Sequence, residues 1–186
     1  MTEVNLIFPN QLFEENTLIK NENTSYLIEE YLFFKHYPFH QQKIAFHRAS
    51  MQFYKDYLTE KGVKVQYIES ANPLSDIRKL IPHLVEKGVK KLTYIDPTDD
   101  WLEKRIKRQL SEQEIEATVL SSPLFLNSKD QLGEFFKEGR KRYFHHSFYV
   151  EQRKRHHIMV DDQDEPQGGR WSYDDENRKK YPRKKT

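Results

Sequence analysis

The sequence of 186 residues contains no cysteine. Within this chain, that absence excludes disulfide bonds, catalysis by a thiolate, and zinc or iron–sulfur sites held by cysteine. The GxGxxG, Walker A and HExxH motifs are also missing, so the usual signatures of a dinucleotide, a nucleoside triphosphate and a catalytic zinc are not found. The first expected strand-to-turn junction, FPNQLF, has no glycine. That disfavours the close backbone approach by which such turns bind a pyrophosphate.

Long hydrophobic runs are missing too. The amino terminus, MTEVNLIFPN, has neither the basic region nor the long apolar region of a signal peptide. No apolar run approaches the roughly 20 residues that cross a bilayer. The formal net charge is only +2, which gives no chain-wide basic signal for nucleic acid. We expect a soluble cytoplasmic protein with no membrane partner.

What is present is an alternation of short apolar runs and amphipathic segments. Nearly continuous apolar runs are typical of strands buried in a parallel sheet, and apolar residues spaced by three or four predict helices. The predicted strands are residues 4–8, 26–29, 63–69, 90–96 and 115–120, and the predicted helices are residues 41–58, 73–87 and 100–110. This order predicts an α/β fold, a Rossmann-like three-layer sandwich with a parallel sheet of about five strands, over residues 1–122.

The character of the chain changes after this domain. Residues 128–137 predict a helix, and residues 140–160 predict a second, long helix rich in basic residues and histidine. We therefore expect residues 123–160 to form a helical extension packed on the α/β domain. Residues 161–186 are polar with alternating charges, and such a composition does not form a core. They are expected to form a linker or extended arm.

An aromatic segment follows the second predicted strand. Glu29 and Glu30 end that strand, and four rings come next, at Tyr31, Phe33, Phe34 and Tyr37. Because ligands bind at the carboxyl ends of parallel strands, these rings either cover the sheet edge or wall a flat aromatic ligand. Neighbours on a strand face opposite sides, so the two glutamates are not expected to act as an acid–base pair. Either one of them faces the crevice, or they form a solvated strand end.

The long basic segment contains two histidine pairs, His145-His146 and His156-His157. Adjacent residues on a helix point about 100° apart, which is poor spacing for zinc, so no metal site is predicted. Basic residues flank aromatic rings in residues 140–155. Such a pattern suits phosphates and stacked bases of a nucleic acid, but a helix that docks on another protein domain has the same pattern and is more common.

Three segments resemble a known family, the photolyase–cryptochrome proteins, in the iron–sulfur bacterial branch of deoxyribodipyrimidine photolyase-related proteins. The segments are LIFPNQLF, FHQQKIAFHRASMQFY, and FYVEQRKRHHIMV followed by QGGRWSYDDENRKKYP. The last is the most specific, because a string with that tryptophan and asparagine rarely arises by chance.

The resemblance implies the amino-terminal antenna-chromophore domain of a photolyase/cryptochrome-related flavoprotein, whose full form carries out light-driven DNA repair or blue-light signalling. FAD and an iron–sulfur cluster are then expected only in a carboxyl-terminal helical domain that is absent here, with residues 161–186 leading toward it. The lack of cysteine agrees with this. The implied partners are that helical domain and, for the full protein, damaged DNA, with a dimer of this chain as an alternative. The parent resembles a carbon–carbon lyase, whereas this chain alone is expected to be non-catalytic.

The resemblance also implies a site. In this branch the antenna is 6,7-dimethyl-8-ribityllumazine, bound at the carboxyl ends of the amino-terminal strands. The implied cofactor-binding residues are Phe8, Pro9, Asn10, Gln11, Glu30, Tyr31, Leu32, Phe33, His40, Lys43 and Ile44. The chain differs from the family pattern at the first turn, where Pro9-Asn10 replaces Gly-Asp, and at Phe33 or Phe34, where the family has an acidic residue. Another chromophore, or an empty pocket, is therefore the alternative.

Two function classes compete with this hypothesis. One is a stand-alone nucleotide-binding or hydrolytic α/β enzyme, which the missing phosphate loop and the missing nucleophile–base motif disfavour. The other is a nucleic-acid or partner-binding α/β module that acts through the basic helix of residues 140–155.

Overall fold

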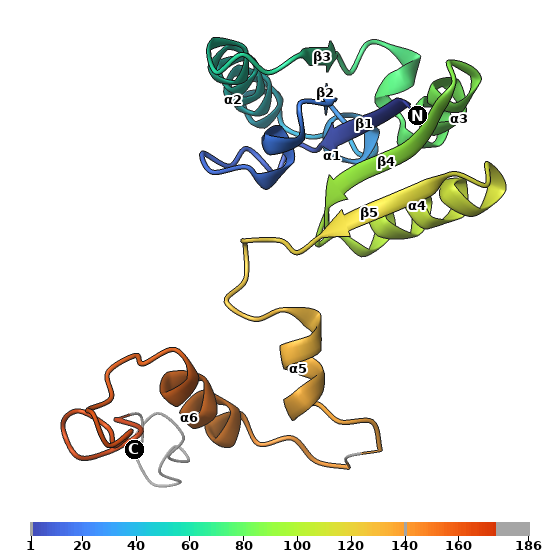
Figure 1. Cartoon of the computed structure of the whole chain (residues 1–186). Coiled ribbons are helices and arrows are strands. Elements are labelled where there is room, and N and C mark those ends of the chain that lie inside the picture. The colour runs from blue at the N-terminus through green and yellow to red at the C-terminus, as the bar shows by residue number, and fades with distance from the viewer. Residues whose placement is uncertain (1, 140, 174–186) are drawn as a thin grey trace, which may run out of the picture. The chain divides into compact units, whose positions relative to one another are not determined.

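The computed structural model describes residues 2–139 and 141–173. The chain divides into two compact units, residues 1–126 and 127–186, which are considered separately below. Figure 1 shows the sheet and its helices in the first unit. In the ranges that the structure describes, no helix is both long enough and apolar enough to cross a membrane.

The first unit is built on a sheet of five parallel strands in the order β3-β2-β1-β4-β5. They are β1 (Thr2–Ile7), β2 (Thr24–Ile28), β3 (Val65–Ile68), β4 (Val89–Ile95) and β5 (Glu116–Leu120). The chain proceeds outward from β1 to β3 and then crosses back to place β4 on the other side of β1 (Figure 1). The order of the sheet therefore reverses between β1 and β4, which is where open α/β sheets most often bind ligands.

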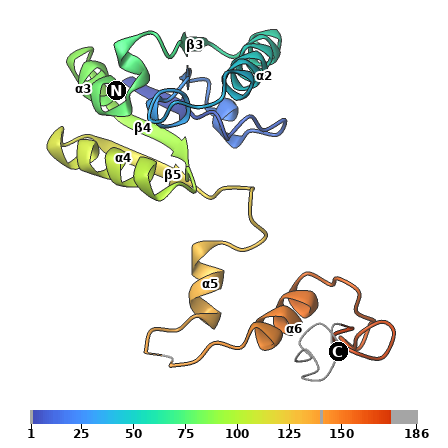
Figure 2. The same cartoon turned by 180° about the vertical axis from the view of Figure 1, so that it is seen from behind.

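Helices cover both faces of this sheet (Figure 2). The helices are α1 (Tyr31–Phe34), α2 (Gln41–Glu60), α3 (Ile77–Glu86) and α4 (Asp100–Glu112), with short 3₁₀ turns η1 (Thr17–Asn21) and η2 (Pro73–Ser75). Because strand side chains alternate, Leu6 and Phe8 pack toward α3 and α4, whereas Ile7 packs toward α2. The predicted Rossmann-like sandwich with five parallel strands is confirmed.

The central strand β1 also carries a buried polar side chain. Asn5 is fully buried, and its Nδ2 donates to the carbonyl of Leu18 at 3.0 Å and to Oδ1 of Asn21 at 2.9 Å. A buried amide is tolerated when it is hydrogen-bonded. These bonds hold η1 against the α2 face of the sheet.

The second unit contains α5 (Lys129–Phe135) and α6 (His145–Arg155). The predicted helix at residues 128–137 is present, with Ser128 as its cap. The single long helix predicted over residues 140–160 is wrong, because α6 covers only the middle of it. At its start, Phe144 has an extended backbone, and beyond its end His157 has a left-handed φ of 50°. The two histidine pairs therefore do not share one helix.

The early end of α6 is explained by Arg153, which is only 5% exposed. Its guanidinium donates to the carbonyls of Ile158 at 3.1 Å, Met159, and Trp171 at 3.4 Å, and it lies 5.1 Å from the Trp171 ring centroid. These contacts fold residues 156–173 back onto α6. Residues 161–173 therefore do not form the extended arm that was expected for them. Residues 174–186 lie outside the described residues. The predicted packing of residues 123–160 on the α/β domain stays a prediction.

Replacing Arg153 should release this loop selectively. In Arg153→Met, the loss of several charged hydrogen bonds, each worth about 1.5–3 kcal/mol, should speed amide hydrogen exchange in residues 156–173 at least tenfold. Exchange in β1 to β5 should not change. Arg155→Met is the matched control, because Arg155 makes partly exposed ion pairs with Glu134 and Glu151, which are worth little. Equal effects of the two variants would contradict the role of Arg153.

Candidate functional site

The gap between β1 and β4 at the carboxyl edge of the sheet is closed by side-chain amides. Gln11 is fully buried, and its Nε2 donates to the carbonyls of Ile95 at 2.9 Å and Asp96 at 3.1 Å. Asn10 Nδ2 donates to the carbonyl of Pro97 at 2.9 Å. The side-chain N–H groups of Gln11 and Asn10 are thus used to hold the first turn against the end of β4. They are not free to bind a ligand at this point.

A hollow of about 340 Å³ opens beside this turn, on the α2 side. It is lined by Pro9, Asn10, Leu12, Phe13, Phe46, His47, Ser50 and Leu124. Most of these side chains are apolar, and the polar ones are an amide, an imidazole and a hydroxyl. Small-molecule sites typically have this character, with apolar walls and a few polar groups, and the volume is at the lower end of their range.

The polar groups of the hollow suit an uncharged ligand. Asn10 lines the hollow, and its Oδ1 is a buried hydrogen-bond acceptor without a partner. Ser50 donates its hydroxyl to the carbonyl of Phe46 at 2.9 Å, which leaves its oxygen as an acceptor. Burial, together with nearby Lys43, lowers the pKa of His47. A neutral imidazole can donate one hydrogen bond and accept another.

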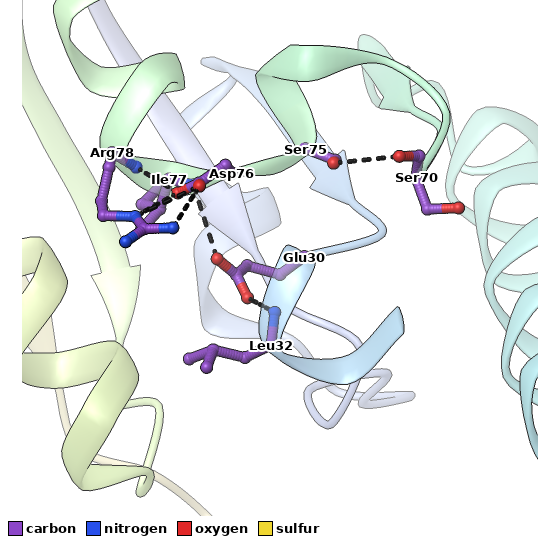
Figure 3. A network of polar contacts seen from close by, with 7 residues as sticks. All are labelled: Glu30, Leu32, Ser70, Ser75, Asp76, Ile77 and Arg78. Carbon is purple, nitrogen blue, oxygen red and sulfur yellow. Dashed lines mark hydrogen bonds and ion pairs between the residues drawn. The ribbon is translucent and has the colours of Figure 1, made fainter. Parts of the chain in front are cut away.

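Glu30 lies on the opposite side of the sheet edge and is fully buried. Its Oε2 accepts from the Leu32 N–H at 2.5 Å, and its Oε1 accepts from the Ile77 N–H at 3.4 Å, so it joins the starts of α1 and α3. The neighbouring cation Arg78 is paired with Asp76 at 2.6 Å (Figure 3). Burial raises the pKa of Glu30 to about 7, although the two amide N–H groups and Arg105 act in the other direction.

Glu29 is equally buried but has the opposite environment. Arg48 on α2 binds both of its oxygens, at 2.7 and 2.6 Å, and the Tyr67 hydroxyl and the Ser70 N–H each donate at 2.7 Å. Burial acts to raise the pKa of Glu29, but these hydrogen bonds outweigh it and the pKa is lowered. The prediction that Glu29 and Glu30 face opposite sides is confirmed. Both are buried against protein groups, and neither is a solvated strand end.

The expected ligand residues are separated by the sheet. Pro9 and Asn10 line the hollow, and Ile44 packs in the cluster on the same side. His40 caps α2 by accepting from the Gln42 N–H at 3.2 Å, and Lys43 Nζ lies 4.0 Å from the Phe39 ring centroid. Of the eleven expected residues, therefore, only Pro9 and Asn10 line this hollow.

The remaining expected residues have structural surroundings. Phe8 and Leu32 belong to the core on the α3 and α4 side, and Phe33 is half-buried against both clusters. The Tyr31 ring lies 5.7 Å from the guanidinium carbon of Arg78 and 5.8 Å from that of Arg105.

None of the four rings in the predicted aromatic segment lines the hollow. Phe34 is buried, and the exposed Tyr37 packs in a cluster with His36 and Trp101.

Six residues of the hollow were not in the expected set. They are Leu12, Phe13, Phe46, His47, Ser50 and Leu124. His47 belongs to the apolar stripe of the predicted helix, where it is indistinguishable from a core residue. Phe46 is 75% exposed on a different flank of α2. In the sequence, the one signal that could have identified it is a phenylalanine that lies outside the apolar stripe of the predicted helix. Nothing in the sequence around Leu124 links it to the first turn.

Metal ligands do not gather elsewhere in the described ranges. Across residues 2–139 and 141–173, no group of three or more His, Asp or Glu side chains is placed to hold a metal ion.

Comparison with known proteins gives three findings. A family profile described as deoxyribodipyrimidine photo-lyase-related protein matches residues 5–186. An uncharacterized protein of Acanthamoeba polyphaga mimivirus is 34% identical over 196 residues, which cover 99% of this chain and 97% of that protein. A (6-4) photolyase of Agrobacterium fabrum is 25% identical over 167 residues, which cover 86% of this chain and 32% of that enzyme. The chain thus spans about a third of the length of that photolyase.

The raised pKa of Glu30 makes stability depend on pH. The native state binds this proton more tightly than the unfolded state, whose pKa is near 4.5. The contribution of Glu30 to the free energy of unfolding therefore falls by roughly 3 kcal/mol as pH rises from about 4.5 to about 7, and it is constant above that pH. Glu30→Gln should avoid this loss. Between pH 5 and pH 8, urea unfolding should show the variant gaining about 2–3 kcal/mol relative to wild type.

Glu29→Gln is the matched control at the adjacent buried position. Because the pKa of Glu29 is lowered, its contribution is present above pH 4.5 and lost as pH falls. This variant should be less stable than wild type at pH 8, with a deficit that shrinks in acid. Parallel stability curves for wild type and Glu30→Gln would show that Glu30 does not titrate in this range.

Proposed function

Because the chain belongs to the family of deoxyribodipyrimidine photolyase-related proteins, we propose that its α/β unit is the antenna-type, chromophore-binding domain of a light-driven flavoprotein. The observation that carries this proposal is the hollow between the first turn and α2. It combines ring walls with a buried acceptor that has no protein partner, Asn10 Oδ1. A flat heterocycle with N–H groups at its edge would supply both a stacking surface and the missing donor.

The residues of the hollow fit 6,7-dimethyl-8-ribityllumazine in its main features. Phe13 and Phe46 would contact its rings, Asn10 would accept from its pyrimidinedione N–H, and His47 and Ser50 would bond its carbonyl or ribityl oxygens. No carboxylate lines the hollow, so these neutral groups would replace the acidic residues expected from the family pattern. When bound, the lumazine would supply absorption at the violet end of the spectrum.

We propose that the flavin and any repair chemistry do not belong to this α/β unit. The chain has no cysteine to hold an iron–sulfur cluster. It covers 32% of the (6-4) photolyase that it matches. We therefore propose that this unit binds and orients a light-absorbing group, and that a helical flavin-binding domain and damaged DNA are partners of the complete protein.

A titration with the lumazine tests this function. Saturable changes in its absorption and fluorescence are expected on addition of the chain. Phe46→Ala should weaken binding about tenfold, because burial of one ring face contributes about 1.5 kcal/mol or more.

Phe53→Ala is the matched control for that titration. Phe53 is also on α2 and is also 75% exposed, but it does not line the hollow, so this variant should bind within twofold of wild type. If riboflavin binds and Phe46→Ala weakens that binding, whereas the lumazine does not bind, the hollow is a chromophore site but the chromophore is not the lumazine. If a folded chain binds neither compound, or the two variants behave alike, the antenna proposal fails.

A further inference from the structure

We propose that residues 136–139 and 141–149 of the second unit form a binding surface for single-stranded nucleic acid. We call this segment the basic aromatic surface. The proposal does not depend on any ligand in the hollow, since it concerns the other unit of the chain. This surface differs from the predicted basic helix over residues 140–155. In the structure, some cations of that predicted helix make contacts within the unit, and others are exposed.

Several rings of this surface are exposed, and two of them, Phe136 and Tyr143, are held in place by other rings. Phe136 is 41%, Tyr143 48% and Phe144 59% exposed. The Phe136 ring centroid lies 5.1 Å from that of Phe148 and 5.2 Å from that of Tyr143. Phe148 in turn packs 5.0 Å from buried Phe135. A stacking platform for bases needs this arrangement, because a ring that is already fixed loses little freedom when a base covers it.

The cations of the predicted helix are not equivalent. Arg153 is buried by its own loop, and Arg155 pairs with Glu134 at 2.8 Å and Glu151 at 3.1 Å. By contrast, Lys141 and Arg142 have exposed side chains, as does Lys137 just before the predicted basic helix. Each of the three lies within seven residues of an exposed ring in the sequence. The described residues of this surface contain three Lys and Arg against one Glu, a formal charge of +2. Positive potential therefore gathers at the aromatic end of the segment.

The composition of this surface favours a polynucleotide over a partner helix or a lipid bilayer. Residues 136–149 contain five aromatic side chains and no Leu, Ile, Val or Met. Docking faces for helices use aliphatic side chains, and membrane-surface helices combine aromatic residues with leucine. Every apolar side chain here is instead a ring that can stack on a base. Unpaired bases expose their faces to such rings and the bases of a duplex do not. A single strand is thus the ligand that uses both the charges and the rings.

Fluorescence anisotropy with a labelled 20-nucleotide oligothymidylate tests the proposal on the full chain. Saturable binding should weaken steeply with salt. In the double variant Lys141→Gln/Arg142→Gln, the slope of log K against log salt should fall by about 1.4, since each phosphate contact contributes about 0.7 for single strands. Phe144→Ala should weaken binding about fivefold or more at constant charge.

Matched controls separate this surface from general attraction to a polyanion. Lys79→Gln/Lys87→Gln removes the same charge from exposed positions of the first unit, and Phe53→Ala removes an exposed ring there. Both should leave binding within twofold. The proposal is overturned if no binding occurs at 20 mM salt, if each variant matches its control, or if a duplex of the same length binds as tightly with no effect of Phe144→Ala.

Discussion

The hydrogen bonds of Gln11 join the two halves of the sheet at its carboxyl edge. Strand order reverses between β1 and β4, so the connections that follow these two paired strands leave toward opposite faces of the sheet, which normally opens a crevice. The buried amide of Gln11 occupies that position and donates to the carbonyls of Ile95, the last residue of β4, and of Asp96 just after it. Asn10 continues the closure to Pro97. The space available to a ligand is therefore not between the ends of β1 and β4 but in the hollow between the first turn and α2. The function proposed for the unit depends on this closure.

The fold could be predicted because its signals are local. Strand runs such as residues 4–8 are apolar at nearly every position, since both faces of a central parallel strand are buried, and the stripe containing Met51, Tyr54 and Leu58 has helical spacing. The hollow could not be predicted in this way. Its walls come from three separate segments, and the sequence around Leu124 contains nothing that places it near Pro9. Family resemblance drew attention to the first turn, which borders the hollow, but not to Phe46 or His47.

Side chains of the same type take different roles here because their partners differ. Glu29 and Glu30 are adjacent and equally buried, yet Arg48 stabilises the charge of the first, while the second has only backbone N–H partners. Similarly, Arg153 is enclosed by its loop and Arg142 is exposed. No count of charges in the sequence distinguishes these cases. The relevant information is the identity of the nearest partner, which depends on tertiary structure.

The measurement that tests the account most directly is a ¹H–¹⁵N correlation spectrum of the chain during addition of 6,7-dimethyl-8-ribityllumazine. The account predicts that shifts concentrate at the amides of Asn10 and of residues 46–50, which border the hollow, while those of residues 30–33 stay largely unchanged. Shifts centred on residues 30–33 would place the ligand at the second strand end and contradict the closure of the sheet edge described here. A spectrum without shifts would remove the antenna assignment of this unit.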